Sequence, residues 1–368
     1  MEFWYTVKNV ADIPTPALLI YPDRIEENLR RMIAIAGDPE KLRPHVKTHK
    51  MAEIITLSLK AGITRFKCST IAEAEMVAAR GGKDVMLAMQ PVGPQLERFF
   101  RLQREFSGTC FSALADHEGV IGQLSATAVK YNMETGIWLD INNGMNRTGI
   151  IPGHAALHLY SRICDLPMVR PSGLHVYDGH IHDGNISDRK TTCEKDFQPV
   201  DLLIARLHKS GHPVPSIMAG GTPTFPIHAL HGDRELSPGT CVLWDRGYEV
   251  NFPDLHFLQA AVLIMRVVSK PGGNLLCLDL GHKAISAEMP HPRIHLPGLP
   301  DCRFVSHNEE HLVIETPDAD AWHPGDVLYG IPWHICPTVP RYPSALVVRD
   351  GKVTEEWAIT ARDRKITV

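Results

Sequence analysis

The sequence lacks the cysteine pattern of a disulfide-rich or zinc-ribbon protein. Its eight cysteines are scattered over 368 residues, and none of them stands in a CxxC pair. In a long chain without an export signal, scattered cysteines are typical of reduced thiols. We therefore expect free thiols, most of them in the core.

The sequence also lacks long apolar runs and a strong charge of either sign. Its longest apolar run, near residues 258–268, is interrupted by Gln259 and Arg266 and is too short to cross a bilayer. No early segment combines the basic start, apolar run and small-residue cleavage site of a signal peptide. The net charge is −4 at pH 7 and the pI is about 6.6. These values favour neither nucleic acid nor an anionic membrane as a partner. Together with the scattered cysteines and the missing signal peptide, they lead us to expect a cytoplasmic protein.

Between about residues 14 and 244, short apolar runs alternate with helical patterns. About eight such units predict an α/β fold, a parallel (β/α)8 TIM barrel over residues 13–244. A doubly wound open sheet is the alternative, and it is less favoured because no GxGxxG follows the first strand. The expected strands are 17–21, 64–69, 84–89, 109–114, 136–141, 173–176 and 216–219, and the expected helices include 23–36, 71–80, 155–164 and 199–210.

After about residue 241 the pattern changes to β-rich runs. Turn sequences such as Lys270-Pro271-Gly272-Gly273 and Asp350-Gly351-Lys352 separate these runs. The change predicts a C-terminal all-β domain of residues 245–368, and residues 1–12 are expected to pair with its sheet.

A basic cluster, Arg43-Pro44-His45-Val46-Lys47-Thr48-His49-Lys50, follows a helical segment. If residues 44–49 are extended, alternation places His45, Lys47 and His49 on one face. Two histidines on the same side disfavour the ammonium form of Lys47, and a neutral lysine amine suits Schiff-base chemistry with an aldehyde cofactor. A charged strand end is an equally good interpretation of the spacing alone.

Two further motifs follow expected strands. Gly220, Gly221 and Thr222 come directly after one, where glycine amides and a hydroxyl can approach a phosphate. Loops after the last barrel strands commonly bind phosphate, which favours this interpretation over a plain turn. Arg147 follows another expected strand and could bind a cofactor oxygen or a substrate carboxylate. A surface arginine in a turn is an equally good interpretation.

A third polar segment, Tyr177-Asp178-Gly179-His180-Ile181-His182-Asp183, also follows an expected strand. The carboxyl ends of barrel strands line the active site, so Tyr177, His180, His182 and Asp183 are candidates for proton transfer. A solvated polar loop is the alternative.

His334-Ile335-Cys336 brings a nitrogen and a sulfur donor together if the segment is a strand, because residues two apart face the same way. This donor pair suits Zn²⁺ and leaves open coordination positions, as catalytic zinc requires. Without further context, a core cysteine beside a surface histidine is the favoured interpretation.

Together the motifs RPHVKTHK, CSTIAEAE, NRTG, HVYDGH, AGGTPT and HICPT occur in the order seen in fold-type III pyridoxal-phosphate enzymes. The chain resembles the branch that contains D-threonine aldolase and eukaryotic-type D-serine dehydratase, over nearly its whole length. PHVKTHK and the late HxC are the most specific elements. The resemblance implies an alanine-racemase-like barrel followed by a β domain.

The resemblance also implies which residues act. Lys47 matches the family's Schiff-base lysine for pyridoxal 5′-phosphate. His334 and Cys336 match the two protein ligands of a divalent metal, expected to be zinc, with manganese or magnesium as alternatives. Beside Lys47, the expected catalytic side chains are Tyr177, His180 and His182, and the expected cofactor-binding residues are His45, Gln90, Arg147, Tyr177, Gly220, Gly221 and Thr222.

Two departures from the family pattern bear on the reaction. The aldolases mostly carry aspartate where this chain has Cys336, which makes it more similar to the zinc-dependent dehydratases. The register of the base after Tyr177 leaves His180, His182 and Asp183 open. The resemblance thus implies a lyase for D-configured β-hydroxy amino acids, with dehydration slightly favoured over aldol cleavage. An amino-acid racemase and a non-catalytic pyridoxal-phosphate carrier are the rival functions, and a homodimer is expected.

Overall fold

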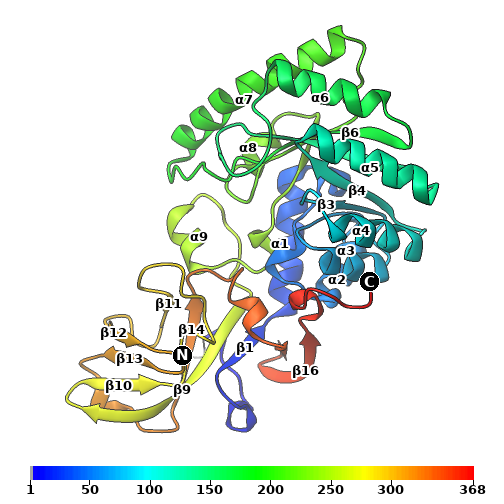
Figure 1. Ribbon diagram of the computed structural model, residues 1–368. Coiled ribbons are helices and arrows are strands. Elements are labelled where there is room, and N and C mark those ends of the chain that lie inside the picture. Colours follow the sequence, from blue (N-terminus) through cyan, green and yellow to red (C-terminus); the bar gives the residue numbers. More distant parts are fainter. Residues whose placement is uncertain (1–2) are drawn as a thin grey trace. The chain divides into compact units, whose positions relative to one another are not determined.

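The computed structural model describes residues 3–368, which form two compact units (Figure 1). One unit, here called the barrel unit, comprises residues 31–47, 55–239 and 363–368. The other, the β unit, comprises residues 3–30, 48–54 and 240–362. Over residues 3–368, no helix combines the length and the hydropathy needed for a bilayer span.

The barrel unit is built on a seven-stranded parallel sheet in which the strands follow one another in chain order. Their central residues are buried apolar side chains, as expected for strands that are covered on both faces. The six predicted strands between residues 64 and 219 are all present, within a few residues of their expected bounds. The strands are β2 Arg65–Cys68, β3 Asp84–Leu87, β4 Cys110–Ala115, β5 Thr135–Ile141, β6 Val169–Val176, β7 Ile217–Ala219 and β8 Arg234–Leu236.

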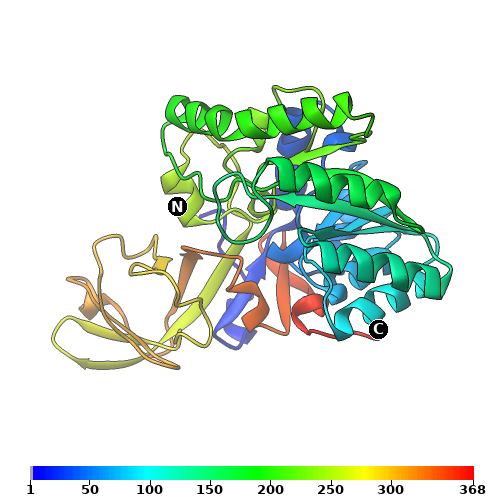
Figure 2. The ribbon, with the colours of Figure 1, turned by 45° about the horizontal axis from the view of Figure 1, so that its top comes forward.

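Helices follow most of these strands, and Figure 2 shows those after β3 to β6, coloured cyan to green, side by side along the outside of the sheet. The predicted helix at 199–210 is part of a much longer one that begins at Ile186 and contains Pro199. The helices of this part of the chain are α1 Pro22–Ala36, α2 Ala52–Lys60, α3 Ile71–Ala79, α4 Pro94–Glu105, α5 Glu118–Tyr131, α6 His154–Asp165, α7 Ile186–Lys209 and α8 Phe225–His228.

A short extended segment closes the barrel between its first and last strands. The amide of Arg43 donates to Leu236 O at 2.8 Å, and the amide of Lys67 donates to Pro44 O at 3.0 Å. Bridges from Leu42 to β8 and from His45 to β2 are parallel. Residues 42–45 thus take the eighth strand position, and the predicted (β/α)8 class is confirmed.

The first predicted strand was assigned to the wrong sheet. Residues Ala17–Ile20 form β1, which pairs antiparallel with β9 and parallel with β15 in the sheet of the β unit. The apolar side chains of β1 are buried in that sheet. Residues 13–30 therefore belong with the β unit, which shifts the predicted boundary at residue 13.

The β unit contains a sheet in the order β12-β13-β10-β9-β1-β15-β16, and β14 pairs with both β9 and β11. The long strand β9 connects the two halves of this sheet, and its first residues are buried and apolar. Besides β1, the elements are β9 Ala261–Gly272, β10 Leu275–Leu278, β11 Ile294–His295, β12 Arg303–His307, β13 Leu312–Glu315, β14 Val327–Pro332, β15 Ser344–Arg349, β16 Lys352–Ala358 and the short helix α9 Arg246–Asn251.

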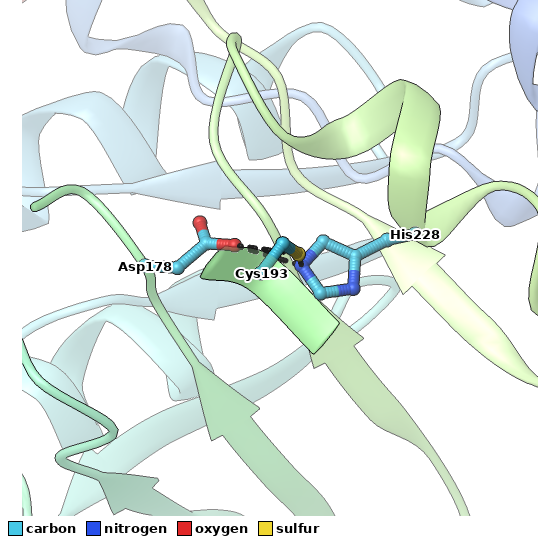
Figure 3. Close-up of side chains that lie close together, drawn as sticks. All are labelled: Asp178, Cys193 and His228. Carbon is cyan, nitrogen blue, oxygen red and sulfur yellow. Dashed lines mark hydrogen bonds and ion pairs between the residues drawn. The ribbon is translucent and has the colours of Figure 1, made fainter. Parts of the chain in front are cut away.

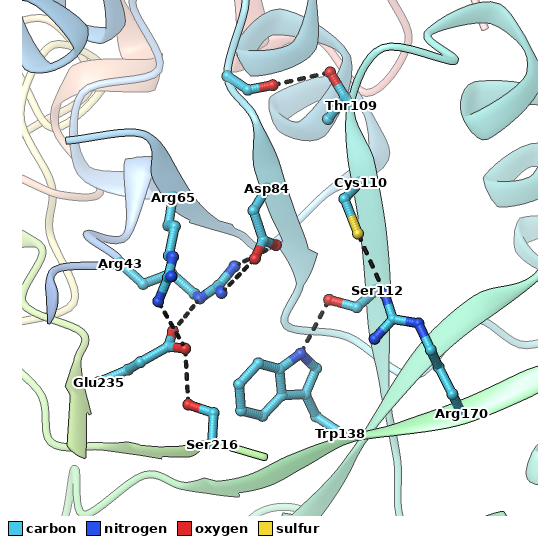
Figure 4. Close-up of polar contacts among 11 residues, drawn as sticks. Arg43, Arg65, Asp84, Thr109, Cys110, Ser112, Trp138, Arg170, Ser216 and Glu235 are labelled. Atoms are coloured by element: carbon cyan, nitrogen blue, oxygen red, sulfur yellow. Dashed lines mark hydrogen bonds and ion pairs between the residues drawn. The ribbon is translucent and has the colours of Figure 1, made fainter. Parts of the chain in front are cut away.

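The amino ends of the barrel strands surround a polar cavity of about 370 Å³ (Figure 4). The buried Arg43 lies there between two carboxylates, 2.6 Å from Asp84 and 2.7 Å from Glu235. Arg65 also lies 3.2 Å from Glu235, so two guanidinium groups balance two carboxylates at the amino end of the barrel. The residues of interest for chemistry follow the opposite, carboxyl ends of the strands.

Candidate active site

Lys47 lies directly after the closing segment, at the carboxyl end of the barrel. The expected alternation of residues 44–49 was wrong, because a 3₁₀ turn, Val46–Thr48, begins after His45. Nδ1 of His45 accepts a hydrogen bond from the amide of Lys47 at 3.3 Å, and Nδ1 of the buried His49 accepts from the amide of Met51 at 3.1 Å. Each histidine thus holds the backbone of the turn, and the half-buried Lys47 side chain is not flanked by them on one strand face.

Tyr177, after β6, is the aromatic centre of this end of the barrel. The guanidinium carbon of Arg147 lies 5.0 Å from its ring centroid, and Nζ of Lys67 lies 5.3 Å from it. A Cβ on Gly179 would overlap the Tyr177 ring. Glycine is therefore required two residues after the tyrosine, and Tyr177 and Arg147 lie together at this end of the barrel.

The loop after β7 has the shape of an anion cradle. Gly220 has φ +80°, and a Cβ on it would lie 2.8 Å from Cδ2 of His228. A Cβ on Gly221 would lie 3.1 Å from Cε2 of Tyr177. The hydroxyl of the buried Thr222 accepts from the amide of Gly239 at 3.1 Å. Glycine is thus needed at 220 and leaves the backbone open at 221, which fits a phosphate group held by main-chain amides.

Behind this loop lies a buried cluster of Asp178, Cys193 and His228, from which sequence reasoning expected nothing (Figure 3). Nε2 of His228 lies 2.7 Å from Oδ2 of Asp178. Oδ1 of Asp178 accepts from the hydroxyl of Thr224 at 2.7 Å, and Arg234 donates to Nδ1 of His228 at 2.7 Å. Only Asp178, inside the HVYDGH motif, offered a signal in the sequence.

This cluster has the residue types of a metal site, but its atoms are already engaged. Because Arg234 donates to Nδ1, the other ring nitrogen of His228 carries the proton and donates to Asp178. Burial raises the pKa of Cys193, so its sulfur remains a thiol. Burial alone would also raise the pKa of Asp178, but hydrogen bonds from His228 and Thr224 hold it below its usual value. The cluster therefore supports the phosphate-type loop through Thr224 rather than offering lone pairs to a cation.

The three candidate bases after Tyr177 differ in their surroundings. Nε2 of His180 lies 2.8 Å from Oδ2 of Asp196 in α7, and Nδ1 of His180 is buried without a hydrogen-bond partner among residues 3–368. His182 is exposed, and Asp183 is half-buried. His180 is thus the one held in a fixed orientation with a second ring nitrogen available.

Gln90, after β3, connects two loops at this end of the barrel. Its side-chain oxygen accepts from the amide of Asp116 at 2.9 Å. Asp116 in turn accepts from the amide of Gly149, close to Arg147, at 2.8 Å. Gln90 therefore fixes the loop that carries Arg147.

Sequence reasoning missed a buried row of three polar residues in the barrel interior, Lys67, His175 and Asp140. Ring nitrogens of His175 lie 2.7 Å from Nζ of Lys67 and 2.6 Å from Oδ1 of Asp140. Lysine and histidine inside strands that are otherwise apolar were the available signal, because such residues are rarely buried without a partner.

In the β unit, His334 and Cys336 lie in the loop after β14. The expectation that they lie on a strand was wrong, since β14 ends at Pro332. Their side chains nevertheless meet, and the hydroxyls of Thr48 and Thr240 lie 3.2 and 3.4 Å from the Cys336 sulfur. Nδ1 of His334 lies 2.6 Å from a carboxylate oxygen of Glu288.

The charges around His334 favour a cation. Burial lowers the pKa of His334, but Cys336, Asp245 and Glu288 outweigh this and raise it to about 9. The ring nitrogen of His334 and the sulfur of Cys336 are donors that suit Zn²⁺, and Glu288 contacts the other ring nitrogen, Nδ1. The donor chemistry of this loop therefore fits the expected metal.

Comparison with known proteins adds family relationships to this geometry. Residues 20–246 match the family model of the alanine racemase N-terminal domain, and residues 260–348 match one described as "Putative serine dehydratase domain". The D-threonine aldolase of an Arthrobacter species is 31% identical over 360 residues, covering 96% of this chain and 94% of the relative. The 3-hydroxy-D-aspartate aldolase of Paracoccus denitrificans (strain Pd 1222) is 27% identical over 370 residues, covering 96% and 93%.

A solved structure matches both parts of the chain. The crystal structure of D-threonine aldolase from Filomicrobium marinum aligns with a TM-score of 0.87 and 26% identity. The alignment covers 98% of this chain and 99% of that one. The fold of each unit is thus similar to that of the corresponding part of this aldolase.

Proposed function

Since this chain belongs to the family that joins an alanine racemase N-terminal domain to a serine dehydratase domain and includes D-threonine aldolase, we propose that it is a pyridoxal-phosphate-dependent lyase that cleaves D-configured β-hydroxy amino acids. Glycine and an aldehyde are the expected products. The family relationship supports the lyase class and the cofactor. The residues described above support the site assignments and the choice of reaction.

The carboxyl end of the barrel fits the cofactor. We assign Lys47 as the amine that binds its aldehyde carbon, and Gly220, Gly221 and Thr222 as the phosphate loop. When bound, pyridoxal phosphate withdraws electrons from the substrate's Cα. The remaining residues proposed to orient the cofactor are His45, Gln90, Arg147 and Tyr177.

His334 and Cys336 are proposed to hold a divalent metal, which we propose to be zinc. Such an ion supplies Lewis acidity to a substrate hydroxyl and lowers the pKa of that hydroxyl. Glu288 holds Nδ1 of His334 at 2.6 Å, so Nε2 is the ring nitrogen that would bind the ion. Glu288 therefore fixes the orientation of the His334 ring.

The observation that carries the choice of aldol cleavage is the His180–Asp196 pair. Asp196 accepts from Nε2 of His180, so Nδ1 carries a lone pair, and this buried atom has no partner among residues 3–368. A base that takes the proton of the β-hydroxyl lets the Cα–Cβ bond break. Tyr177 is proposed to pack on the reacting groups, while the exposed His182 is left as an alternative base.

Dehydration is the second candidate, and Cys336 favours it, because the resemblance places cysteine at this position in zinc-dependent dehydratases. In that reaction the base acts at Cα, a role for Lys47, and hydroxide leaves from Cβ. Keto acid and ammonia would be the products. We also propose that the enzyme is a homodimer, which light scattering of the purified protein would test.

A product assay with D-threonine and D-serine tests the proposal. We expect glycine and an aldehyde from the wild type, a loss of at least about a hundredfold in turnover for His180→Asn, and none detectable for Lys47→Ala. The exposed His208→Asn serves as the matched control and should leave turnover unchanged. Keto acid and ammonia as products would show dehydration in place of aldol cleavage. Full turnover in Lys47→Ala would reject the proposed role of Lys47.

A further inference from the structure

Three buried side chains from three strands form one hydrogen-bonded row in the barrel. Asp140 comes from β5, His175 from β6 and Lys67 from β2. Each is at most 4% exposed. The distances are 2.6 Å from Asp140 Oδ1 to His175 Nδ1 and 2.7 Å from His175 Nε2 to Lys67 Nζ.

The order of donors and acceptors in this row follows from its members. An ionised carboxylate only accepts, so Nδ1 of His175 carries a proton and Nε2 presents a lone pair. The nitrogen of Lys67 can donate a hydrogen bond to that lone pair, because it carries protons in either charge state. Burial alone would raise the pKa of Asp140, but His175, Thr148 and Lys67 lower it below its usual value. The row thus has an anion at one end and an amine at the other.

The amine end is surrounded by charged groups of the proposed cofactor site. Lys47 follows the closing segment, Arg147 follows β5, and Asp178 follows β6; all three, together with Asp140, act on Lys67. The ring of Tyr177 lies 5.3 Å from Nζ. Burial, Lys47 and Arg147 lower the pKa of Lys67 to about 7, against the opposing effects of Asp140 and Asp178. The charge of Lys67 therefore changes within the ordinary working range of an enzyme.

A purely structural role explains this arrangement poorly. Barrel interiors are normally filled by branched apolar residues, and a buried ammonium carries a large desolvation cost. Burial and Lys67 lower the pKa of His175, which favours a neutral ring that accepts a hydrogen bond from Lys67. Lys47 interacts electrostatically with Lys67, so an amine at this place affects the charge state of Lys47.

We propose that Lys67 is a positioning residue of the cofactor site: held by His175 and Asp140, its amine sets the local charge and thereby controls whether the nitrogen that joins Lys47 to pyridoxal phosphate carries a proton. This inference rests on the proposed function. A protonated Lys67 repels a proton at that nitrogen, and a neutral Lys67 does not. Lys67 acts through Lys47 and takes no proton from the substrate itself.

The test is a pH titration of the visible absorption band of the holoenzyme without substrate, since this band reports protonation of the linked nitrogen. Lys67→Met removes the positive charge, so the midpoint of the titration should rise by about one pH unit. Lys67→Arg keeps the charge and should return the midpoint to the wild-type value or below. The exposed Lys83→Met is the control and should leave the midpoint unchanged.

A second variant keeps the test decisive if Lys67→Met does not fold. Asp140→Asn removes the anion that favours the charged form of Lys67, so Lys67 becomes neutral more readily and the midpoint should rise, as in Lys67→Met. Equal midpoints in the wild type, Lys67→Met and Asp140→Asn would overturn the role of Lys67 and leave the proposed function intact. A wild-type holoenzyme with no visible band at all would instead reject the attachment at Lys47, and this inference with it.

Discussion

Nε2 of His228 lies 2.7 Å from Oδ2 of Asp178, and both side chains are almost fully buried. Asp178 follows β6, whereas His228 ends the short helix after the Gly220–Thr222 loop. The same carboxylate accepts from Thr224 with its other oxygen, at 2.7 Å. One anion thus ties the loop after β7 to the loop that carries Tyr177.

The substitution Asp178→Asn should weaken cofactor binding about tenfold or more. His228 must donate from Nε2, since Arg234 occupies Nδ1, and Thr224 donates to the same carboxyl group. An amide offers one oxygen to two donors, so one buried donor is left unpaired, at a cost of about 1–3 kcal/mol. Equilibrium dialysis with pyridoxal phosphate measures the change in Kd. The exposed Asp188→Asn is the control, and an unchanged Kd in Asp178→Asn would show that the loop does not depend on this anion.

Removal of one sulfur should empty the proposed metal site. We expect about one zinc per chain in protein dialysed against zinc, and less than about a tenth of that in Cys336→Ala, because a site with so few protein donors loses most of its affinity with one of them. Metal content by mass spectrometry measures this directly. Cys302→Ala, another half-buried thiol of the β unit, is the matched control. Equal zinc content in both variants would remove Cys336 from the site.

Much of the barrel could be predicted from the sequence, because a parallel strand that is covered on both faces is a short continuous apolar run. That rule located β2 to β7 within a few residues. It could not assign β1, since Ala17–Ile20 has the same pattern whichever sheet it joins; only pairing with β9 and β15, far along the chain, decides. The eighth barrel position, residues 42–45, carries too few apolar residues to register as a strand.

The residues of the candidate site also differ in whether the sequence alone could point to them. Arg147, Tyr177 and the Gly220–Thr222 loop were proposed from the sequence because each follows an expected strand, and Lys47 was proposed from the basic cluster after a helical segment. Lys67 and His175 were not, because they meet across 108 residues of chain. The turn at Val46–Thr48 and the loop position of His334 were not predicted. Polar and apolar residues can alternate in the sequence of a turn as well as in an extended segment, so the pattern does not distinguish the two.

Glu75, in the CSTIAEAE motif, is a buried carboxylate that accepts several hydrogen bonds. Removal of this carboxylate should destabilise the barrel unit. Glu75 is 3% exposed and accepts from the amides of Thr367 and Val368 at 2.9 and 3.2 Å, and from the Thr367 hydroxyl. Glu75→Ala leaves these donors without their acceptor, so we expect the free energy of unfolding to fall by about 2 kcal/mol. Urea denaturation followed by circular dichroism measures this. The exposed Glu105→Ala should change it little, and equal midpoints for the two variants would contradict the role assigned to Glu75.

His49 should make the protein less stable in mild acid. Burial lowers the pKa of His49 from 6.5 to about 3, although its hydrogen bond with Met51 opposes the shift. Below a pH of about 6.5, the unfolded chain binds a proton at this histidine that the folded chain does not. The stability that His49 confers is therefore complete above that pH and is lost progressively as the pH falls towards 3.

Between about pH 7 and pH 5, this linkage should lower the free energy of unfolding by about 2 kcal/mol. His49→Gln keeps a side-chain acceptor for the Met51 amide but cannot be protonated, so the difference in stability between the two pH values should shrink by that amount. Other groups titrate in the same range, and they cancel when the variant is compared with the wild type in urea at both pH values. His208→Gln, at an exposed position, should retain the full wild-type dependence. A His49→Gln variant with the same dependence would mean that the folded protein accommodates a charged imidazole at this place, so the burial of its ring would not be what limits stability in acid.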